Sequence, residues 1–152
     1  MLVRTIRLLV VDDSPGYQYL IKTCFEKHRA KYHSLITTAS TGEEALQLLF
    51  SDEVENRSLP DLVLLDWNLP KISGSEVLQR MKEHRELAKI PVLVFSSSSA
   101  GQDIHQAYAS HANGYIVKPG TIELMEEVVE AIARFWIAIA QLPRVVRSQA
   151  AR

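Results

Sequence analysis

Acidic residues follow two apolar runs of this sequence, and their type and placement make them the clearest candidates for a chemical role. Asp12 and Asp13 come directly after the run 6–11, and Asp66 follows the four apolar residues 62–65. A serine, Ser96, and a lysine, Lys118, end two further apolar runs in the same way. Short apolar runs bounded by turn residues indicate buried strands of a parallel sheet, whose carboxyl ends meet at one edge. We therefore expect these five side chains to converge at that edge.

The charges of this group decide what it could do. Three close carboxylates repel one another and raise one another's pKa, and a charge at the rim of a buried strand is costly unless it is paired. Hard oxygen ligands of this kind suit Mg²⁺, which keeps several waters and takes one or two carboxylates. A lysine and a hydroxyl beside the cation would complete a clamp on a transferring phosphoryl group. The residue types predict a magnesium site that handles phosphate.

The segments that must position these residues alternate between strand and helix. Strands are predicted at about 6–11, 33–38, 62–65, 90–95 and 114–117. Helices are predicted at about 16–28, from a cap at Ser40 to 50, from Ser73 onward, at 102–110, and from Thr121 to about Gln141. Five strands alternating with five helices predict an α/β fold, with a doubly wound parallel sheet, right-handed crossovers and helices on both faces.

The composition is that of a single globular domain. The 152 residues are 47% hydrophobic and 23% charged, with a net charge of −1, which gives no support for partners such as nucleic acid or a membrane surface. The lone Cys24 cannot form an internal disulfide and suits a reducing compartment. The N-terminus lacks the apolar core of a signal peptide, and no apolar run approaches the roughly 18 residues that span a bilayer. We expect a cytoplasmic protein.

Five motifs in a fixed order resemble the receiver domain of two-component response regulators. They are residues 10–14 (VVDDS), 64–70 (LLDWNLP), 73–74 (SG), 91–96 (PVLVFS) and 114–119 (GYIVKP). The resemblance covers roughly residues 7–142, and the combination of motifs is far more specific than any single one. The resemblance implies a five-stranded sheet in the order 2-1-3-4-5, the flavodoxin/CheY-like arrangement. We accordingly expect a receiver domain over 1–143 with an extended last helix, followed by a disordered tail over 144–152.

The resemblance also implies roles for the acidic residues and their neighbour. Asp66 corresponds to the phosphoacceptor, and Asp13 to the main carboxylate ligand of Mg²⁺ or Mn²⁺. Asp12 would contact the cation largely through water, and Asn68 would offer its backbone carbonyl. The cation would bridge the acceptor carboxylate and the phosphoryl oxygens.

Three further residues would surround the phosphoryl group. Ser96 corresponds to a hydroxyl that hydrogen-bonds it, Lys118 to its cationic partner, and Tyr115 to an aromatic switch that turns inward when the hydroxyl moves. The implied function is that of a single-domain response regulator, which takes a phosphoryl group from a histidine kinase and relays the signal through protein contacts. It would not be an enzyme beyond its own phosphorylation and autodephosphorylation. The layout is similar to regulators that serve bacterial phytochrome-type histidine kinases, which makes such a kinase the expected partner.

Two other protein classes use similar residues. A haloacid-dehalogenase-type phosphatase also has a nucleophilic aspartate at a strand end, but it requires a second aspartate two residues later, where this chain has Asn68. A flavodoxin-like flavin protein requires a phosphate loop rich in glycine and hydroxyls after the first strand. Asp12 and Asp13 stand there instead and would repel a flavin phosphate. The phosphoacceptor switch explains these residues best.

Each residue also has a purely structural interpretation. Taken alone, Asp12 and Asp13 would suit a helix-capping turn, Ser96 an ordinary polar loop, and Lys118 the protein surface. Tyr115 on a strand would simply be packed. Only the joint placement at strand ends favours the functional interpretation. We further expect Trp67, which follows Asp66, to form a wall of the site and to face solvent or a partner.

The last predicted helix carries more apolar surface than one sheet requires. One stripe of this helix would cover the sheet, whereas Phe135, Ile139 and Leu142 continue a second stripe on another face. A contiguous exposed apolar patch marks an interface, and twofold pairing is the commonest closed assembly. We therefore predict a homodimer through these three residues. The alternative is that the tail after Pro143 folds back over the stripe.

Overall fold

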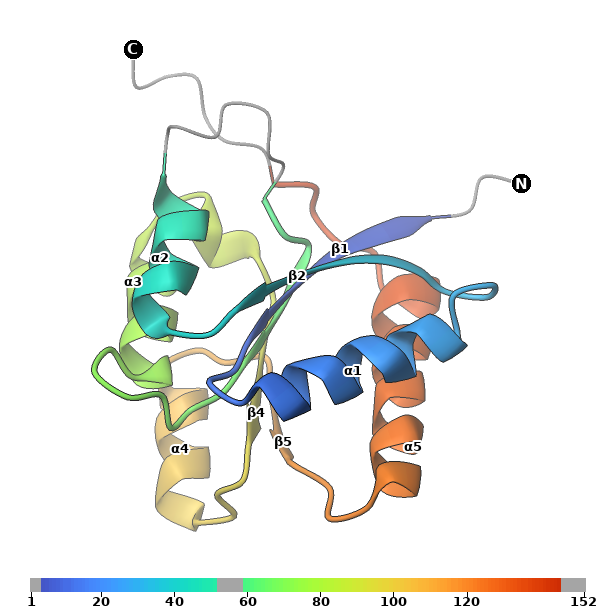
Figure 1. Ribbon diagram of the computed structural model, residues 1–152. Coiled ribbons are helices and arrows are strands. Elements are labelled where there is room, and N and C mark those ends of the chain that lie inside the picture. Colours follow the sequence, from blue (N-terminus) through green and yellow to red (C-terminus); the bar gives the residue numbers. More distant parts are fainter. Residues whose placement is uncertain (1–3, 52–58, 146–152) are drawn as a thin grey trace.

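Five parallel strands form the centre of the molecule (Figure 1). The computed structural model describes residues 4–51 and 59–145. The strands are β1 (Thr5–Val11), β2 (His33–Ala39), β3 (Leu62–Leu65), β4 (Val92–Ser96) and β5 (Gly114–Val117). They pair in the order β2-β1-β3-β4-β5, which confirms the expected order and places β1 and β3 side by side with their carboxyl ends together.

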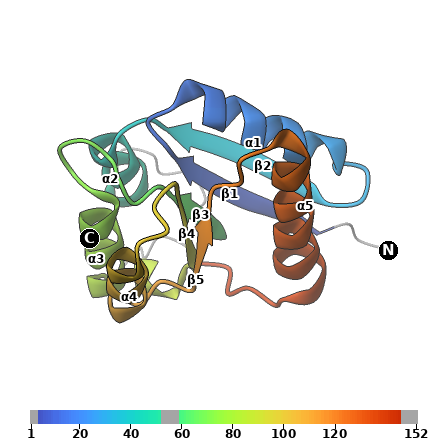
Figure 2. The same ribbon diagram turned by 90° about the horizontal axis from the view of Figure 1, so that it is seen from below.

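Helices cover both faces of the sheet, as the alternating pattern predicted (Figure 2). They are α1 (Pro15–Lys27), α2 (Gly42–Phe50), α3 (Gly74–Glu83), α4 (Gly101–Ala109) and α5 (Ile122–Ala133), with a short 3-10 turn, η1 (Leu87–Lys89), before β4. Helices α1 and α5 lie on one face, and α2, α3 and α4 lie on the other. The doubly wound architecture is therefore present.

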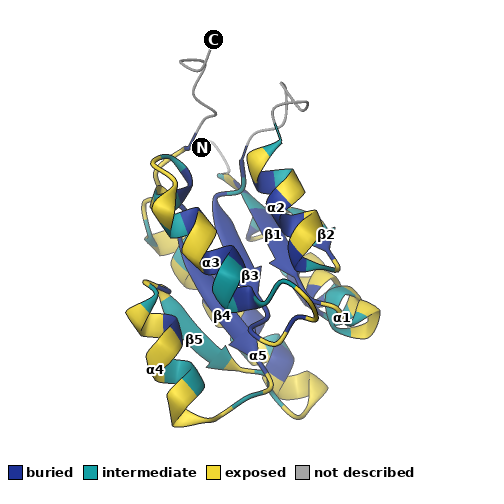
Figure 3. Cartoon of the chain, turned by 90° about the vertical axis from the view of Figure 1, so that its left-hand side faces the viewer, coloured by how far each residue is buried: buried dark blue, intermediate teal, exposed yellow. Residues whose placement is uncertain are grey.

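The core is divided by the sheet into two apolar clusters, because successive residues of a strand point to opposite faces. In β1, Leu8 and Val10 join the cluster under α1 and α5, while Leu9 and Val11 join the cluster under α2 and α3. All four residues of β3 are buried (Figure 3). This explains the continuous apolar run before Asp66, since a central parallel strand is covered on both faces.

Side-chain caps fix where the helices begin, and one expected cap is wrong by one residue. Thr41, not Ser40, caps α2, because the Glu44 backbone N–H donates to Thr41 Oγ1 at 3.0 Å. The Glu44 carboxylate in turn accepts from the Ser40 backbone N–H at 2.9 Å. Glu44 therefore bonds back to the residue before the cap, so the two hydrogen bonds resemble a capping box without closing on the cap residue itself.

The end of the last helix differs from the prediction. The α-helical hydrogen bonding stops at Ala133, a π-helical segment η2 (Arg134–Ile139) follows, and the helix does not continue to Gln141. The Ala140 backbone N–H donates to the Phe135 carbonyl at 2.6 Å. Arg4 donates to the Ala140 carbonyl at 2.5 Å, so a cation occupies the helix C-terminus where the dipole favours it.

The packed chain extends past Pro143. Val145 is only 5% exposed and belongs to the apolar cluster under α2 and α3, on the face opposite α5. The segment after η2 therefore crosses from one face to the other and does not cover Phe135 or Ile139, which are 49% and 59% exposed. The remainder of the expected tail, 146–152, lies outside the described residues. Over 4–51 and 59–145, no helix is long and apolar enough to cross a membrane.

Candidate functional site

Asp12, Asp13 and Asp66 meet at the carboxyl ends of β1 and β3. One carboxylate oxygen of each residue lies within 4.8 Å of the others. Asp12 and Asp66 are 2% and 6% exposed, whereas Asp13 is exposed. Three hard oxygen donors with one side open to water fit Mg²⁺ or Mn²⁺, because both cations favour carboxylate oxygens and retain water ligands.

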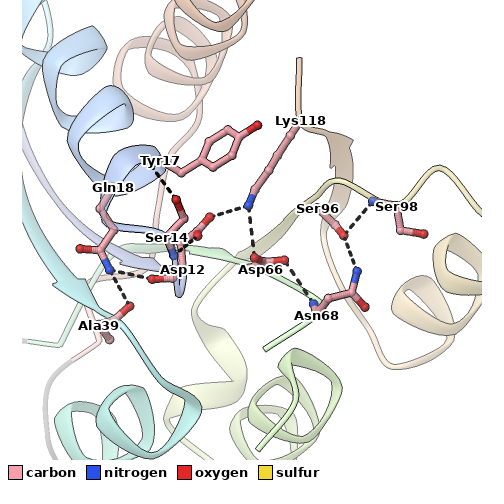
Figure 4. A network of polar contacts seen from close by, with 10 residues as sticks. All are labelled: Asp12, Ser14, Tyr17, Gln18, Ala39, Asp66, Asn68, Ser96, Ser98 and Lys118. Carbon is pink, nitrogen blue, oxygen red and sulfur yellow. Dashed lines mark hydrogen bonds and ion pairs between the residues drawn. The ribbon is translucent and has the colours of Figure 1, made fainter. Parts of the chain in front are cut away.

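The loop from β1 to α1 is held by hydrogen bonds at both ends (Figure 4). Asp12 Oδ1 accepts from the Ser14 backbone N–H at 2.8 Å, and Ser14 Oγ caps α1 by accepting from the Tyr17 N–H at 3.3 Å. The Gln18 side-chain amide donates to the carbonyl oxygens of Asp12 at 2.6 Å and of Ala39 at 3.3 Å. The acidic pair is thus tied to the ends of both β1 and β2.

Lys118 reaches into the acidic group from the end of β5. Its Nζ lies 2.6 Å from Asp12 Oδ2 and 3.2 Å from Asp66 Oδ2, and its side chain is only 5% exposed. Burial raises the pKa of the Asp12 carboxyl above its ordinary value of 3.8, and the bond from Lys118 only partly offsets this. Burial alone would lower the pKa of Lys118, but its bonds and attraction to the two carboxylates raise it above 10.5. The ammonium therefore stays charged beside Asp66.

The opposite side of Asp66 is lined by polar groups of the β3–α3 and β4–α4 loops. The Asn68 backbone N–H donates to Asp66 Oδ1 at 3.2 Å. The Asn68 side-chain amide and the Ser98 N–H both donate to Ser96 Oγ, at 3.4 and 3.2 Å. Ser96 is fully buried at the end of β4. The Ser96 hydroxyl and the Asp66 carboxylate are thus linked through one residue, Asn68 (Figure 4).

Gly74 at the start of α3 allows this helix to approach the site. A Cβ atom at Gly74 would lie 2.2 Å from the carbonyl oxygen of Asp66 and 2.8 Å from Cα of Trp67. Ser73 caps the helix by accepting from the Glu76 N–H at 3.2 Å. The backbone of the Asp66 residue is therefore held directly against α3.

Tyr115 contacts the loop that follows Ser96. Its hydroxyl donates to the Ser98 carbonyl at 2.8 Å, and its partly buried ring packs against the cluster under α2 and α3. Ser98 also donates through Oγ to Asp103 at 2.6 Å, at the start of α4. A chain of contacts therefore runs from Ser96 through the loop to both β5 and α4.

Trp67 does not form an exposed wall of the site, and that expectation is wrong. The side chain is 5% exposed and lies in the cluster under α2 and α3. The reason is the direction of the chain after β3: the Gly74 N–H donates to the Trp67 carbonyl at 3.1 Å, which keeps the residue packed beneath the start of α3.

With this geometry established, the family of the chain follows from comparison. Residues 8–130 match the response regulator receiver domain. The chain belongs to this family. The match confirms the resemblance that the five motifs carried, and the receiver domain accounts for all five strands.

Individual relatives of the receiver domain are similar over nearly their whole length. This chain is 37% identical over 136 residues to the probable methanogenesis regulatory protein FilR2 of Methanothrix harundinacea, and the match covers 90% of this chain and 86% of the relative. It is 32% identical over 136 residues to the response regulator Rcp1 of a Synechocystis strain, covering 90% and 92%.

Solved structures of two such proteins superpose closely on the receiver domain. The phosphorylated cyanobacterial phytochrome response regulator RcpA matches with a TM-score of 0.85 and 35% identity, over 91% of this chain and 99% of RcpA. The Mn²⁺-bound form of Rcp1 matches with a TM-score of 0.83 and 31% identity, over 91% and 99%. The fold similarity thus extends to response regulators of phytochrome signalling.

Several residues of the receiver site were not singled out from the sequence. Tyr17 and Gln18 gave no signal beyond an apolar stripe and a polar neighbour, because their contacts to Lys118 and Ala39 are made across the sheet edge. Gly74 was recognised only as part of a motif. Ser14 could have been found as the cap of α1, since the Ser-Pro pair suits the cap and first turn of a helix.

Proposed function

We propose that this receiver domain acts as a single-domain response regulator that accepts a phosphoryl group on Asp66. The supporting observation is the position of the Asp66 carboxylate, which belongs to the acidic group and also accepts from Lys118 at 3.2 Å. Only 6% of this residue is exposed, so its charge is held in a confined site with a cation on one side. Rcp1 and RcpA, which are similar to this chain over nearly their whole length, are response regulators. RcpA has been solved in its phosphorylated form.

The proposed reaction is a direct transfer of the phosphoryl group. A carboxylate oxygen of Asp66 attacks the phosphorus, an O–P bond forms, and the bond from phosphorus to the donor breaks. The electron pair leaves with the donor, either a phosphohistidine nitrogen of a kinase or the acetate of acetyl phosphate. Lys118 and Ser96 would bind phosphoryl oxygens. A bound Mg²⁺ or Mn²⁺, held by Asp12, Asp13, Asp66 and the Asn68 carbonyl, would neutralise the charge that otherwise repels phosphate.

The signal would be relayed by the contacts that join Ser96 to Tyr115. If Ser96 turns toward the phosphoryl group, its loop moves, and the bond between Tyr115 and the Ser98 carbonyl must rearrange. The ring of Tyr115 would then turn further inward, which changes the face formed by α4, β5 and α5. The cytoplasmic partner that supplies the phosphoryl group would be a histidine kinase, and the similarity to RcpA favours one of the phytochrome type.

The exposed apolar residues at the end of the last helix support a homodimer. Phe135 and Ile139 are 49% and 59% exposed on η2, and the described part of the segment that follows, up to Val145, packs on the opposite face. Leu142, which we expected in the same stripe, is half-buried against the cluster under α1 and α5. Phe135 and Ile139 would therefore supply most of the interface, with Leu142 at its border.

Phosphorylation of Asp66 is tested by labelling with radioactive acetyl phosphate in the presence of Mg²⁺. We expect label on the wild-type protein, loss of label when Mg²⁺ is chelated, and no label on Asp66→Asn. The control is Glu43→Gln, which removes an exposed carboxylate at the start of α2 and should be labelled at the wild-type rate. Mg²⁺-dependent label that persists on Asp66→Asn would assign the acceptor to another residue.

A further inference from the structure

The ammonium group of Lys118 has three contacts, and one of them is an aromatic ring. Nζ lies 2.6 Å from Asp12 Oδ2 and 3.2 Å from Asp66 Oδ2, and it lies 4.2 Å from the centre of the Tyr17 ring (Figure 4). A lysine ammonium has three N–H donors. Two carboxylates and one ring face can therefore satisfy the whole group without water, in agreement with a side chain that is 5% exposed.

Tyr17 is also among the residues that line a surface pocket. The pocket lies between the start of α1 and the start of α5, and its lining includes Gly16, Tyr17, Gly120 and Thr121 but not Lys118. One side of the tyrosine thus belongs to an open pocket, and its ring face carries the cation.

The three contacts of Lys118 differ in what happens to them during the proposed reaction. Asp12 and Asp66 are also candidate ligands of a divalent cation, and Asp66 is the proposed acceptor, so both carboxylates that hold Lys118 would have other partners when the site is loaded. The ring of Tyr17 binds neither a metal nor phosphate. It is the contact that can hold the ammonium in place while the carboxylates exchange partners.

We infer that Tyr17 is a positioning residue for phosphoryl transfer, which keeps the Lys118 ammonium beside Asp66 through a cation–π contact when Asp12 is engaged by a metal ion. This inference rests on the proposed function. It assigns the ring, and not the hydroxyl, as the active part of Tyr17. The ring acts through Lys118 alone, so its effect disappears when Lys118 is absent.

The test measures the rate of labelling by acetyl phosphate at saturating Mg²⁺. Acetate leaves with the electron pair as the O–P bond to Asp66 forms, so the rate reports the transfer itself. A partly desolvated cation–π contact corresponds to a rate decrease of about 3- to 10-fold in Tyr17→Leu. Tyr17→Phe keeps the ring and should retain most of the rate. Tyr19→Leu changes a 73% exposed tyrosine of the same helix and should label as the wild type does.

A second pair of variants separates positioning from a general effect on folding. In a Lys118→Met background, adding Tyr17→Leu should cause no further decrease, because the contact is already gone. Mg²⁺ affinity should stay within about twofold in Tyr17→Leu, since the ring contacts no carboxylate of the site. If Tyr17→Leu does not fold by circular dichroism, Tyr17→Met, which also lacks a ring, takes its place.

The outcomes distinguish this inference from the proposed function. Absence of label on the wild type would overturn the proposed function. A labelled wild type together with an unchanged rate in Tyr17→Leu would overturn the role of Tyr17 alone. An equal decrease in Tyr17→Phe, or the same decrease in the Lys118→Met background, would also overturn it. A decrease confined to the ringless variants with Lys118 present supports it.

Discussion

Lys118 neutralises part of the negative charge of the acidic group. It contacts Asp12 and Asp66, while Asp13 lies on the exposed side. Three carboxylates with one ammonium leave two negative charges among these four residues, which is the charge that a divalent cation balances. The side on which water can reach the group is the side of Asp13. Asp13 and Asp12 should therefore contribute differently to metal binding and to stability.

We predict that Asp13→Ala removes most of the stabilisation that Mg²⁺ gives to the folded protein. A ligand at 100 times its Kd stabilises by about 2.7 kcal/mol, which for a chain of this size raises Tm by about 5–10 °C. Thermal unfolding of the wild type and of Asp13→Ala, with Mg²⁺ and with chelator, measures this. Asp12→Ala should keep more of the shift. An equal Mg²⁺ shift in the wild type and Asp13→Ala would contradict the assignment.

We predict that metal-free stability depends on pH through Asp12. Burial raises the pKa of this carboxyl in the folded protein above 3.8, so the unfolded state loses its proton first. Stability therefore falls as pH rises from 3.8 through the raised value. Lys118 acts outside this window, because its raised pKa contributes stability that is lost only above 10.5. In chelator, Asp12→Asn should gain Tm relative to the wild type as pH rises above 3.8. A constant difference across this range would refute the prediction.

At the scale of the secondary-structure elements, the site depends on how closely the helices approach the strand ends. Helix α3 begins against the backbone of Asp66 and Trp67 and admits only a glycine at its first residue. Helix α4 also begins with a glycine, Gly101, but a Cβ atom there would meet nothing within 4 Å. The same residue type thus has a packing role in one helix and none in the other.

We predict opposite effects for alanine at these two helix starts. Gly74→Ala forces α3 away from Asp66 and should destabilise by about 1–3 kcal/mol, as overpacking does, with slower phosphorylation. Gly101→Ala should be neutral or stabilise by up to about 1 kcal/mol, because it restricts the unfolded chain without a clash. Urea unfolding of both variants measures the two free energies. Equal stabilities would show that the approach of α3 is not tight.

How much the sequence could predict varies with the range of the contact. Apolar runs predicted β1, β3, β4 and β5, whereas β2 was predicted from a weaker pattern. The strand ends predicted that Asp12, Asp66 and Lys118 would meet, because parallel topology alone brings them to one edge. The expectation of an exposed Trp67 was wrong, since the burial of this residue depends on how the loop to α3 turns. The change to π-helical bonding after Ala133 was also missed, because an apolar pattern does not distinguish 3.6 from wider helical turns. Tyr17 makes its contact across elements, where periodicity carries no information.

At the scale of the whole molecule, the apolar residues that remain exposed suggest where a second copy would bind. Phe135 and Ile139 lie close together on η2, whereas Tyr19 on α1 and Leu35 on β2 are exposed apart from them. Single exposed apolar residues are ordinary, but a pair at one helix end suits an isologous contact.

We predict that the wild type is a dimer at tens of micromolar and that Phe135→Glu/Ile139→Glu is a monomer, as measured by light scattering. Charges placed in an apolar interface remove the burial that drives association. Leu35→Glu, which changes a 58% exposed residue on the edge strand, is the control and should remain dimeric. A wild type that stays monomeric, both unphosphorylated and phosphorylated, would exclude the dimer.

The path of the chain after η2 has a practical consequence for how this protein can be handled. The segment that follows η2 runs at the end of the sheet away from the carboxyl ends of the strands (Figure 1), and its Val145 packs into the cluster under α2 and α3. A fluorescent reporter or a surface anchor joined beyond this point would leave Asp66 open to a docking kinase. Ending the chain before Val145, by contrast, would remove a buried apolar side chain from the cluster under α2 and α3. Attachment should therefore come after Val145 rather than replace it.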